Sequence, residues 1–379
     1  MILSLADPTA LHRAVQTLAE GGLVGLPTET VYGLGADTSN DAAVAKIFAA
    51  KGRPADHPLI VHVADLDGGA SGVAHFAQQV PDFAQALMAA FWPGALTLIL
   101  PRRPGVATAA AGGQDSVGLR CPSHPGAQAL LRALRQQPQG AVWGVAAPSA
   151  NRFGRVSPTT ADHVQSELGE ELLILDGGPC SLGIESTIVD CTRGVPVLLR
   201  PGSISSEALA QACGQQVRSA ADPAGTAAQT TNAVAGTGAS GAKEPLPSAP
   251  RASGTLESHY APRARVRLFE ATALMAALPN WRTALGLPPV PIGTAPVVAA
   301  AASAGSGAHL GVYARSFAPD AASGFVLRRM PATAAQTAQE LFAVLRALDD
   351  AGVQEIWVER VPVTPDWAAV ADRLQRASA

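Results

Sequence analysis

A stretch with few large apolar side chains divides the chain into two parts. From Gln215 to Ser258 the sequence is mostly Ala, Gly, Thr, Ser and Pro, with no aromatic residue. Such a segment cannot bury enough apolar surface to offset the entropy lost on ordering, so we expect a flexible linker. The rest of the 379-residue chain is long enough for separate cores. The sequence therefore predicts a first domain over residues 1–214, a linker over 215–262 and a second domain over 263–379.

Helix and strand patterns alternate in both of these parts. In the first, Phe83–Phe91 has a helical pattern, while Ala95–Leu100 and Val142–Ala147 read as apolar strands. In the second, Val266–Phe269 and Glu355–Val358 read as strands and are followed or separated by helical patterns. Such alternation is typical of a sheet covered by crossing helices, so we predict an α/β fold for each part.

Composition limits the class of protein. Charged residues make up 15% of the chain and the formal net charge is −3, which argues against a generally basic surface. No run of about 18 apolar residues exists, so no membrane span is expected. The N-terminal residues lack the pattern of a signal peptide. The four cysteines are widely spaced without a Cys-x-x-Cys pair, which fits a reducing compartment. We therefore expect a cytoplasmic protein.

A basic pair lies where an amphipathic helix is expected to end. Lys51 and Arg53 are separated by Gly52 and followed by Pro54, so both side chains can turn toward one anion. The guanidinium offers a planar fork suited to phosphate or carboxylate, and the ammonium offers a compact charge. Sequence therefore predicts an anion site at this point.

Further cations and hydroxyls lie at other predicted strand ends, beside Gly and Pro. They are Arg120, Arg200, Thr28, Thr30, Ser149, Ser157, Ser186 and Thr187. Taken singly, each arginine could be a surface charge, and His62 in its apolar strand could be a core histidine with a satisfied ring. Their joint placement at element ends favours a binding site for an anionic ligand. No serine has a clear base beside it, which argues against nucleophilic catalysis.

Several familiar motifs are missing from the sequence. It has no Gly-x-x-x-x-Gly-Lys-Ser/Thr loop, and no Gly-x-Gly-x-x-Gly follows a strand. It also has no Gly-x-Ser-x-Gly elbow and no His-x-x-x-His or Cys/His array. We therefore expect no metal held by the protein's own residues.

A set of ordered motifs resembles the YrdC-like domain family. They are Pro27–Gly35, Lys51–Pro54, Pro58–His62, Trp92–Gly94, Ala147–Asn151 and Glu185–Thr187. The later His259-Tyr260-Ala261-Pro262 and the second α/β part resemble the long, two-domain form of the threonylcarbamoyl-AMP synthase family. The resemblance implies a twisted mixed-sheet domain followed by a smaller Rossmann-like α/β domain.

The resemblance also implies a reaction. L-Threonine, bicarbonate or CO2, and ATP with Mg2+ would give threonylcarbamoyl-AMP and pyrophosphate. The adenylate would serve a downstream threonylcarbamoyl transferase complex that modifies adenosine 37 of tRNAs, with contact to tRNA as a further expectation. Little covalent work would fall to the protein, which must position the reactants, neutralise charge and exclude water.

The family's site residues carry over to this chain by matching motif positions. The resemblance assigns threonine binding to Thr30, His62, Arg120, Ala147 and Ser186. It assigns ATP binding to Arg53, His57, Ser116, Ser149, Ser157, Arg200 and Tyr260. Lys51 and Arg53 would act at the phosphates and the carbamate, and the segment carrying Tyr260 would fold over the site as a lid.

This chain departs from the family pattern at two places in the first part. His57 stands where Asn is expected, and Phe153 precedes Gly154 where Ser is common. Two other functions remain open. An RNA-binding module of this fold is disfavoured by the net charge of −3 and 4% aromatic residues. A carbamoyl-transfer protein would also carry zinc-finger and acylphosphatase segments, which are absent here.

Overall fold

A computed structural model describes residues 1–66, 69–138, 140–219, 249–256, 259–284, 310–316 and 325–379. The first part of the chain is organised around an 11-stranded mixed sheet. In their order across the sheet, its strands are β1 (Ile2–Ser4), β10 (Leu173–Asp176), β2 (Val24–Leu26), β3 (Gly33–Asp37), β9 (Val145–Ala146), β4 (Ile60–His62), β8 (Ser116–Arg120), β7 (Leu96–Pro101), β11 (Thr187–Asp190), β12 (Val197–Arg200) and β13 (Arg218–Ser219). Strand β13 lies within the predicted linker, whose residues 220–248 and 257–258 are outside the described residues.

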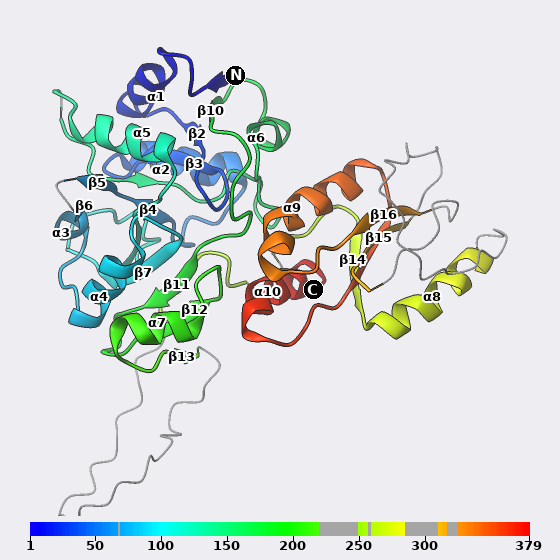
Figure 1. The fold of residues 1–379 in the computed structure, drawn as a ribbon. Helices are drawn as coiled ribbons and strands as arrows, with labels where there is room; N and C mark the ends of the chain where they lie inside the picture. Colours follow the sequence, from blue (N-terminus) through cyan, green and yellow to red (C-terminus); the bar gives the residue numbers. More distant parts are fainter. Residues whose placement is uncertain (67–68, 139, 220–248, 257–258, 285–309, 317–324) are drawn as a thin grey trace, which may run out of the picture.

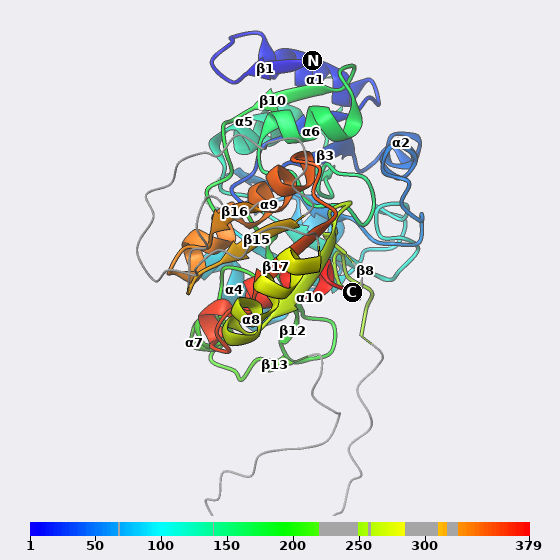
Figure 2. The same ribbon diagram turned by 90° about the vertical axis from the view of Figure 1, so that its right-hand side faces the viewer.

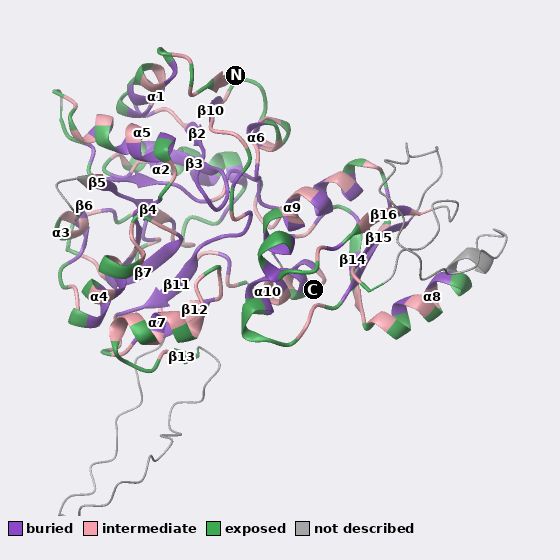
Figure 3. Cartoon of the chain, viewed as in Figure 1, coloured by how far each residue is buried: buried purple, intermediate pink, exposed green. Residues whose placement is uncertain are grey.

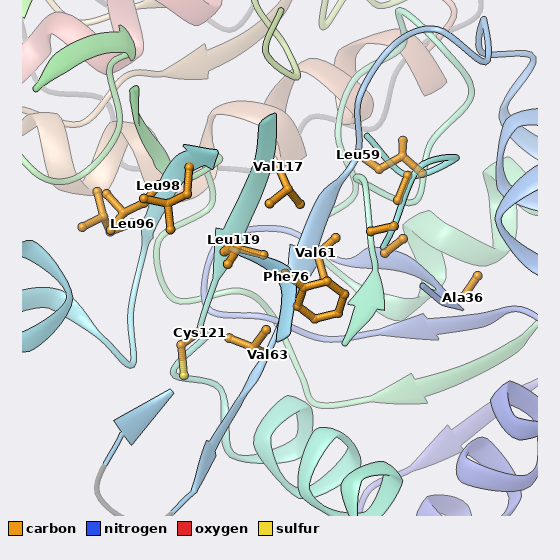
Figure 4. Close-up of a cluster of buried hydrophobic side chains, with 14 of the residues drawn as sticks. Ala36, Leu59, Val61, Val63, Phe76, Leu96, Leu98, Val117, Leu119 and Cys121 are labelled. Carbon is orange, nitrogen blue, oxygen red and sulfur yellow. The ribbon is translucent and has the colours of Figure 1, made fainter. Parts of the chain in front are cut away.

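Helices cover this sheet (Figure 1). They are α1 (Ala10–Ala19), α2 (Asp41–Lys51), α3 (Val73–Phe76), α4 (Asp82–Phe91), α5 (Pro125–Arg135), α6 (Ala161–Leu168) and α7 (Ser206–Cys213), and a small hairpin pairs β5 (Ala64–Leu66) with β6 (Gly69–Ser71). Apolar side chains from neighbouring strands and from α3 meet in the core, where Val61 of β4, Leu119 of β8 and Phe76 of α3 lie close together (Figure 4). The core holds the central strands rigidly, so their ends can position side chains.

The second part is a four-stranded parallel sheet with helices on both sides. Its strands are β14 (Arg265–Phe269), β17 (Glu355–Glu359), β15 (Leu310–Ala314) and β16 (Val326–Arg329), in that order. Its helices are α8 (Ala271–Ala284), α9 (Ala334–Asp350) and α10 (Ala368–Ala377), with a short 3-10 turn at Pro365–Trp367. The predicted α/β fold class is confirmed for both parts, including the Rossmann-like parallel arrangement of the second. None of the helices in the described part of the chain is long and apolar enough to cross a membrane.

Helices α9 and α10 face the first domain, whereas α8 lies on the far side of the small sheet (Figures 1 and 2). Val31, Val156 and Ile184 of the first domain join the apolar cluster formed by α9 and α10. The facing sides of these helices are buried (Figure 3). Ion pairs cross the same boundary, including Arg346–Glu167 at 3.0 Å and Arg155–Asp349 at 3.0 Å. The two domains therefore share a core and charged contacts.

The close approach of α9 gives a testable prediction at Gly183. This glycine has φ +73°, and a Cβ built on it would overlap the backbone of Gln339 in α9. We expect Gly183→Ala to lower the free energy of unfolding by about 1–2 kcal/mol for the left-handed backbone. Overpacking of the new methyl group against the helix should lower the free energy of unfolding by about 1–3 kcal/mol more. Urea denaturation measures the change.

The matched control is Gly178→Ala. Gly178 has φ +79° and no atom within 4 Å of its built Cβ, so only the backbone cost applies. Equal loss of stability in the two variants would show that α9 does not pack against this turn.

Candidate active site

A polar cavity of about 500 Å³, including its open mouth, lies among the strand ends of the first domain. Nine residues that the sequence assigned to threonine or ATP line it: Thr30, Arg53, His62, Arg120, Ala147, Ser149, Ser186, Arg200 and Tyr260. The structure thus gathers side chains that are up to 230 residues apart, counted from Thr30 to Tyr260.

Neighbouring strand ends form one end of the cavity. Strands β4 and β8 are parallel, and His62 pairs in register with Arg120, so both side chains leave the sheet together. Thr30 lies in the turn after β2, where the Thr28 hydroxyl accepts hydrogen bonds from the backbone N–H groups of Thr30 and Val31. Arg120 donates from Nη1 to the Thr30 hydroxyl at 2.7 Å. This end therefore presents a cation, a hydroxyl and an imidazole.

The sequence did not single out the counter-charge of Arg120. Glu29 Oε1 lies 2.8 Å from Arg120 Nη2, and both side chains are buried. Burial raises the pKa of the Glu29 carboxyl, but the Arg120 charge and hydrogen bond outweigh it and hold that pKa below its usual value. Glu29 does not line the cavity. It therefore orients Arg120 from behind and leaves the guanidinium edge toward the cavity.

His62 is a buried ring with no hydrogen-bond partner among the described residues. Burial, followed by the Arg120 charge, lowers its pKa to about 3. A buried polar group normally finds a partner, so an unpaired imidazole on a cavity wall indicates a place for a ligand atom. The ring is neutral at physiological pH.

The other end of the cavity carries two arginines joined by a serine. Arg53 Nη2 donates to Pro58 O at 2.8 Å and to Ser253 Oγ at 3.2 Å. Arg200 donates from Nη1 to Ser253 O at 2.9 Å and from Nε and Nη2 to Ser186 O. Burial lowers the pKa of Arg53 to about 10, so it remains charged. These two guanidiniums give the cavity a strongly cationic wall.

Lys51 lies behind the wall and does not line the cavity. It closes α2, and Gly52 follows with φ +62°, which turns the chain so that Arg53 reaches the cavity. The Lys51 ammonium is buried and donates to Ser149 O at 2.5 Å and to Asn151 O. Burial lowers the pKa of this ammonium well below its usual value. In this structure its contacts hold the Ser149 loop.

Three other predicted ATP residues lie outside the cavity wall. Ser157 donates to Glu185 Oε1 at 2.5 Å, and the His57 ring packs edge-on against Phe153 at 5.4 Å. The two departures from the family pattern therefore touch each other. Ser116 lines a second cavity of about 290 Å³, which shares Ile60 and Ser253 with the first. The two cavities are thus adjacent.

The lining residues that the sequence did not assign to the site include Glu185, Ser253, Gly254 and His259. Ser253 and Gly254 lie in the segment whose composition predicted a linker. In the same segment, Arg251 Nη1 lies 2.7 Å from Asp56 Oδ2, and the Arg251 backbone N–H donates to the Gln114 side chain.

The backbone at Tyr260 has φ +64°. Such strain usually costs about 1–3 kcal/mol and is typical of functional sites.

The buried histidines predict a pH-dependent stability. Burial lowers the pKa of both His62 and His259 to about 3. Between about pH 3 and pH 6.5 the unfolded chain therefore binds more protons than the folded chain, and stability falls as the pH is lowered. When the pH is lowered from about 7 to about 5, we expect the two rings together to reduce the free energy of unfolding by up to about 4 kcal/mol. Urea denaturation at both pH values tests this.

The control is the double variant His62→Gln, His259→Gln. It should lose a large part of the pH dependence, because glutamine does not titrate. A variant with the full dependence of the wild type would contradict the assignment to these rings.

Comparison with known proteins agrees with this arrangement. Residues 16–202 match the Sua5–YciO–YrdC family model, described as "Telomere recombination", and residues 204–379 match "Threonylcarbamoyl-AMP synthase, C-terminal domain". A Pyrococcus abyssi threonylcarbamoyl-AMP synthase is 36% identical over 95% of this chain and 92% of its own. A Bacillus subtilis threonylcarbamoyl-AMP synthase is 46% identical over 54% of this chain and 56% of its own, so that match spans little more than half of the relative.

The fold leads to the same relatives. The crystal structure of P. abyssi Sua5 complexed with L-threonine covers 100% of this chain and 97% of its own, with 31% identity and a TM-score of 0.77. The resemblance seen in the motifs is thereby confirmed. Because the match to the P. abyssi protein spans nearly the whole of both chains, this chain belongs to the threonylcarbamoyl-AMP synthase family of nucleotidyltransferases.

Proposed function

We propose that this protein joins L-threonine, bicarbonate or CO2, and ATP into threonylcarbamoyl-AMP, with release of pyrophosphate. One observation carries the proposal: a single cavity combines the Thr30–His62–Arg120 end with the Arg53–Arg200 wall. The first end suits an amino acid and the second suits phosphates. The names of the relatives support the synthase reading rather than that of an RNA-binding module.

The threonine would occupy the end formed by β4 and β8. Arg120 would pair with its carboxylate, since a guanidinium matches a carboxylate in geometry and charge. Thr30 and Ser186 would offer hydroxyls, and the neutral His62 ring would meet the amino or hydroxyl group. Ala147 and Gly33 also line the cavity, and a small ligand side chain would meet them. The P. abyssi structure with bound L-threonine supports this choice of substrate.

ATP, entering with its Mg2+, would occupy the cationic end. Arg53, Ser149 and Arg200 would bind the phosphates, with Tyr260 covering them. The nucleoside would extend toward the adjacent cavity that Ser116 lines. Ser157 and His57 would not touch the nucleotide directly. They would position Glu185 and Phe153, with which they are in contact.

Mg2+ usually keeps its waters and is held through substrate phosphates. Within the described part of the chain no cluster of three His, Cys, Asp or Glu residues could bind a metal.

The chemistry follows from this placement. The neutral amino group of threonine would attack CO2 and release one proton to water, which gives a carbamate, and a carbamate oxygen would then attack the α-phosphorus of ATP. The α-phosphorus–oxygen bond to the leaving pyrophosphate then breaks. Arg53 would stabilise the charge that develops on the phosphates, and Lys51 would hold the loop carrying Ser149 in position. Exclusion of water would protect the labile carbamate.

The product would supply a threonylcarbamoyl transferase that modifies tRNA. Pyrophosphate release from Mg-ATP tests the proposal, with threonine and bicarbonate each omitted in turn. We expect release only when both are present. Release that does not depend on threonine would point to another carbamate or to plain ATP hydrolysis.

A further inference from the structure

One arginine of the second domain reaches the wall of the cavity. Arg373 lies in α10 and is fully buried. Its Nε donates to Glu185 Oε2 at 2.8 Å, and its Nη1 to Asp372 Oδ2 at 2.6 Å. Glu185 belongs to the first domain and lines the cavity. A charge of the second domain is therefore in direct contact with a residue of the proposed active site.

Glu185 connects this arginine to two residues assigned to substrates. Its other carboxylate oxygen, Oε1, accepts a hydrogen bond from Ser157 at 2.5 Å. The next residue along the chain is Ser186, whose carbonyl accepts hydrogen bonds from Arg200. Burial raises the pKa of Glu185, but Arg373 and then Arg200 outweigh it and keep the carboxylate charged. Removing Arg373 would take away the charged partner of Oε2 and leave the carboxylate with its Ser157 hydrogen bond.

The same guanidinium also contacts Tyr260. Arg373 Cζ lies 5.3 Å from the centre of the Tyr260 ring, and Phe342 of α9 stacks on that ring at 5.5 Å. At the end of α10 the Arg376 carbonyl accepts a hydrogen bond from the His259 N–H at 3.2 Å. The second domain thus supports the segment over the cavity through both α9 and α10. Arg373 is the group that touches this segment and Glu185 together.

We propose that Arg373 is a positioning residue of the active site, through which the second domain orders Glu185 and Tyr260 on the nucleotide side. The inference rests on the proposed function, since it concerns the affinity of the same site for ATP. Arg346 and Arg155 also tie the domains together. Arg346 pairs with Glu167 and donates to the backbone carbonyls of Val156 and Ser157, and Arg155 pairs with Asp349, so neither side chain bonds to Glu185. A buried pair often adds little net stability over an apolar pair, so simple attachment does not explain Arg373 well.

The test compares Arg373→Met with Arg155→Met in the full chain. Both changes remove an arginine side chain that crosses the domain boundary, but the Arg155 side chain pairs with Asp349, which is not a residue of the cavity wall. We expect Arg373→Met to raise KM for ATP by about 10- to 100-fold, because one charge-assisted hydrogen bond changes an affinity by about that factor. KM for threonine should change much less. Arg373→Lys should recover part of the ATP affinity, because it keeps the charge near Glu185.

A second readout separates this inference from the proposed function. Calorimetric titration with a non-hydrolysable Mg-ATP analogue measures affinity without turnover. Weaker binding in Arg373→Met than in Arg155→Met supports the positioning role even if wild type releases no pyrophosphate. The same KM and affinity in both variants would overturn it and leave Arg373 as an attachment between domains.

The single variant leaves Glu185 charged and unpaired in the interior and can fail to fold. The double variant Arg373→Met, Glu185→Gln removes both charges and keeps the volumes similar. We expect it to fold with a wild-type-like melting curve and still to bind the analogue about 10-fold more weakly. Wild-type affinity in the folded double variant would also contradict the proposal.

Discussion

Replacement of Arg120 by methionine should raise KM for threonine by at least about 100-fold, because a buried charge-assisted pair with the substrate carboxylate is lost. KM for ATP should change little. The variant should also lose about 3–5 kcal/mol of stability, because Glu29 stays buried without its partner. Steady-state kinetics and urea denaturation measure the two effects separately.

The double variant Arg120→Met, Glu29→Gln separates folding from binding. It removes the orphaned charge, so most of the lost stability should return while the threonine KM stays high. If the double variant also regained threonine affinity, Arg120 would not be the group that binds the carboxylate.

Replacement of Arg53 by alanine should lower the rate of threonine-dependent pyrophosphate release by about 100- to 1000-fold, the usual effect of removing one donor to a developing charge. Threonine binding should survive, because Arg53 bonds to Pro58 and Ser253, whereas Arg120 bonds to Thr30 and Glu29. Arg53→Lys should recover only part of the rate, since an ammonium lacks the planar fork. Stopped assays of pyrophosphate give the rates.

The control for Arg53 is Arg103→Ala. Arg103 lies outside both cavities, and its side chain donates to Ala74 O. Its rate should match that of the wild type. Comparable losses in the two variants would mean that charge in general, rather than the Arg53 position, controls the reaction.

Local patterns predicted the element types well because periodicity reflects the face that each element buries. Asn40 caps α2, and its side chain accepts a hydrogen bond from Ala43 N. The strand expected over Val142–Ala147 is shorter, since only Val145 and Ala146 pair with neighbours. An apolar run shows that residues are buried, but not how far the partner strand extends. The strand order depends on such long-range pairing and did not follow from the sequence.

The cavity gathers predicted residues that lie in family motifs, whereas partners from distant parts of the chain were not predicted. Glu29 stands inside such a motif, but its contact with Arg120 spans 91 positions. Glu185 acts through Arg373, 188 residues later. No local pattern encodes such contacts. The positions of Ser253 and Gly254 could not be predicted from composition, because a stretch of small residues gives no sign that it lies on a cavity wall.

The most direct test of the account is to identify the product. Purified protein would be incubated with Mg-ATP, threonine and isotopically labelled bicarbonate, and the nucleotides would be separated and weighed by mass spectrometry. The account predicts an AMP adduct that carries both threonine and the label, and that is missing when either is omitted. An adduct without the label, or only ADP and phosphate, would contradict it.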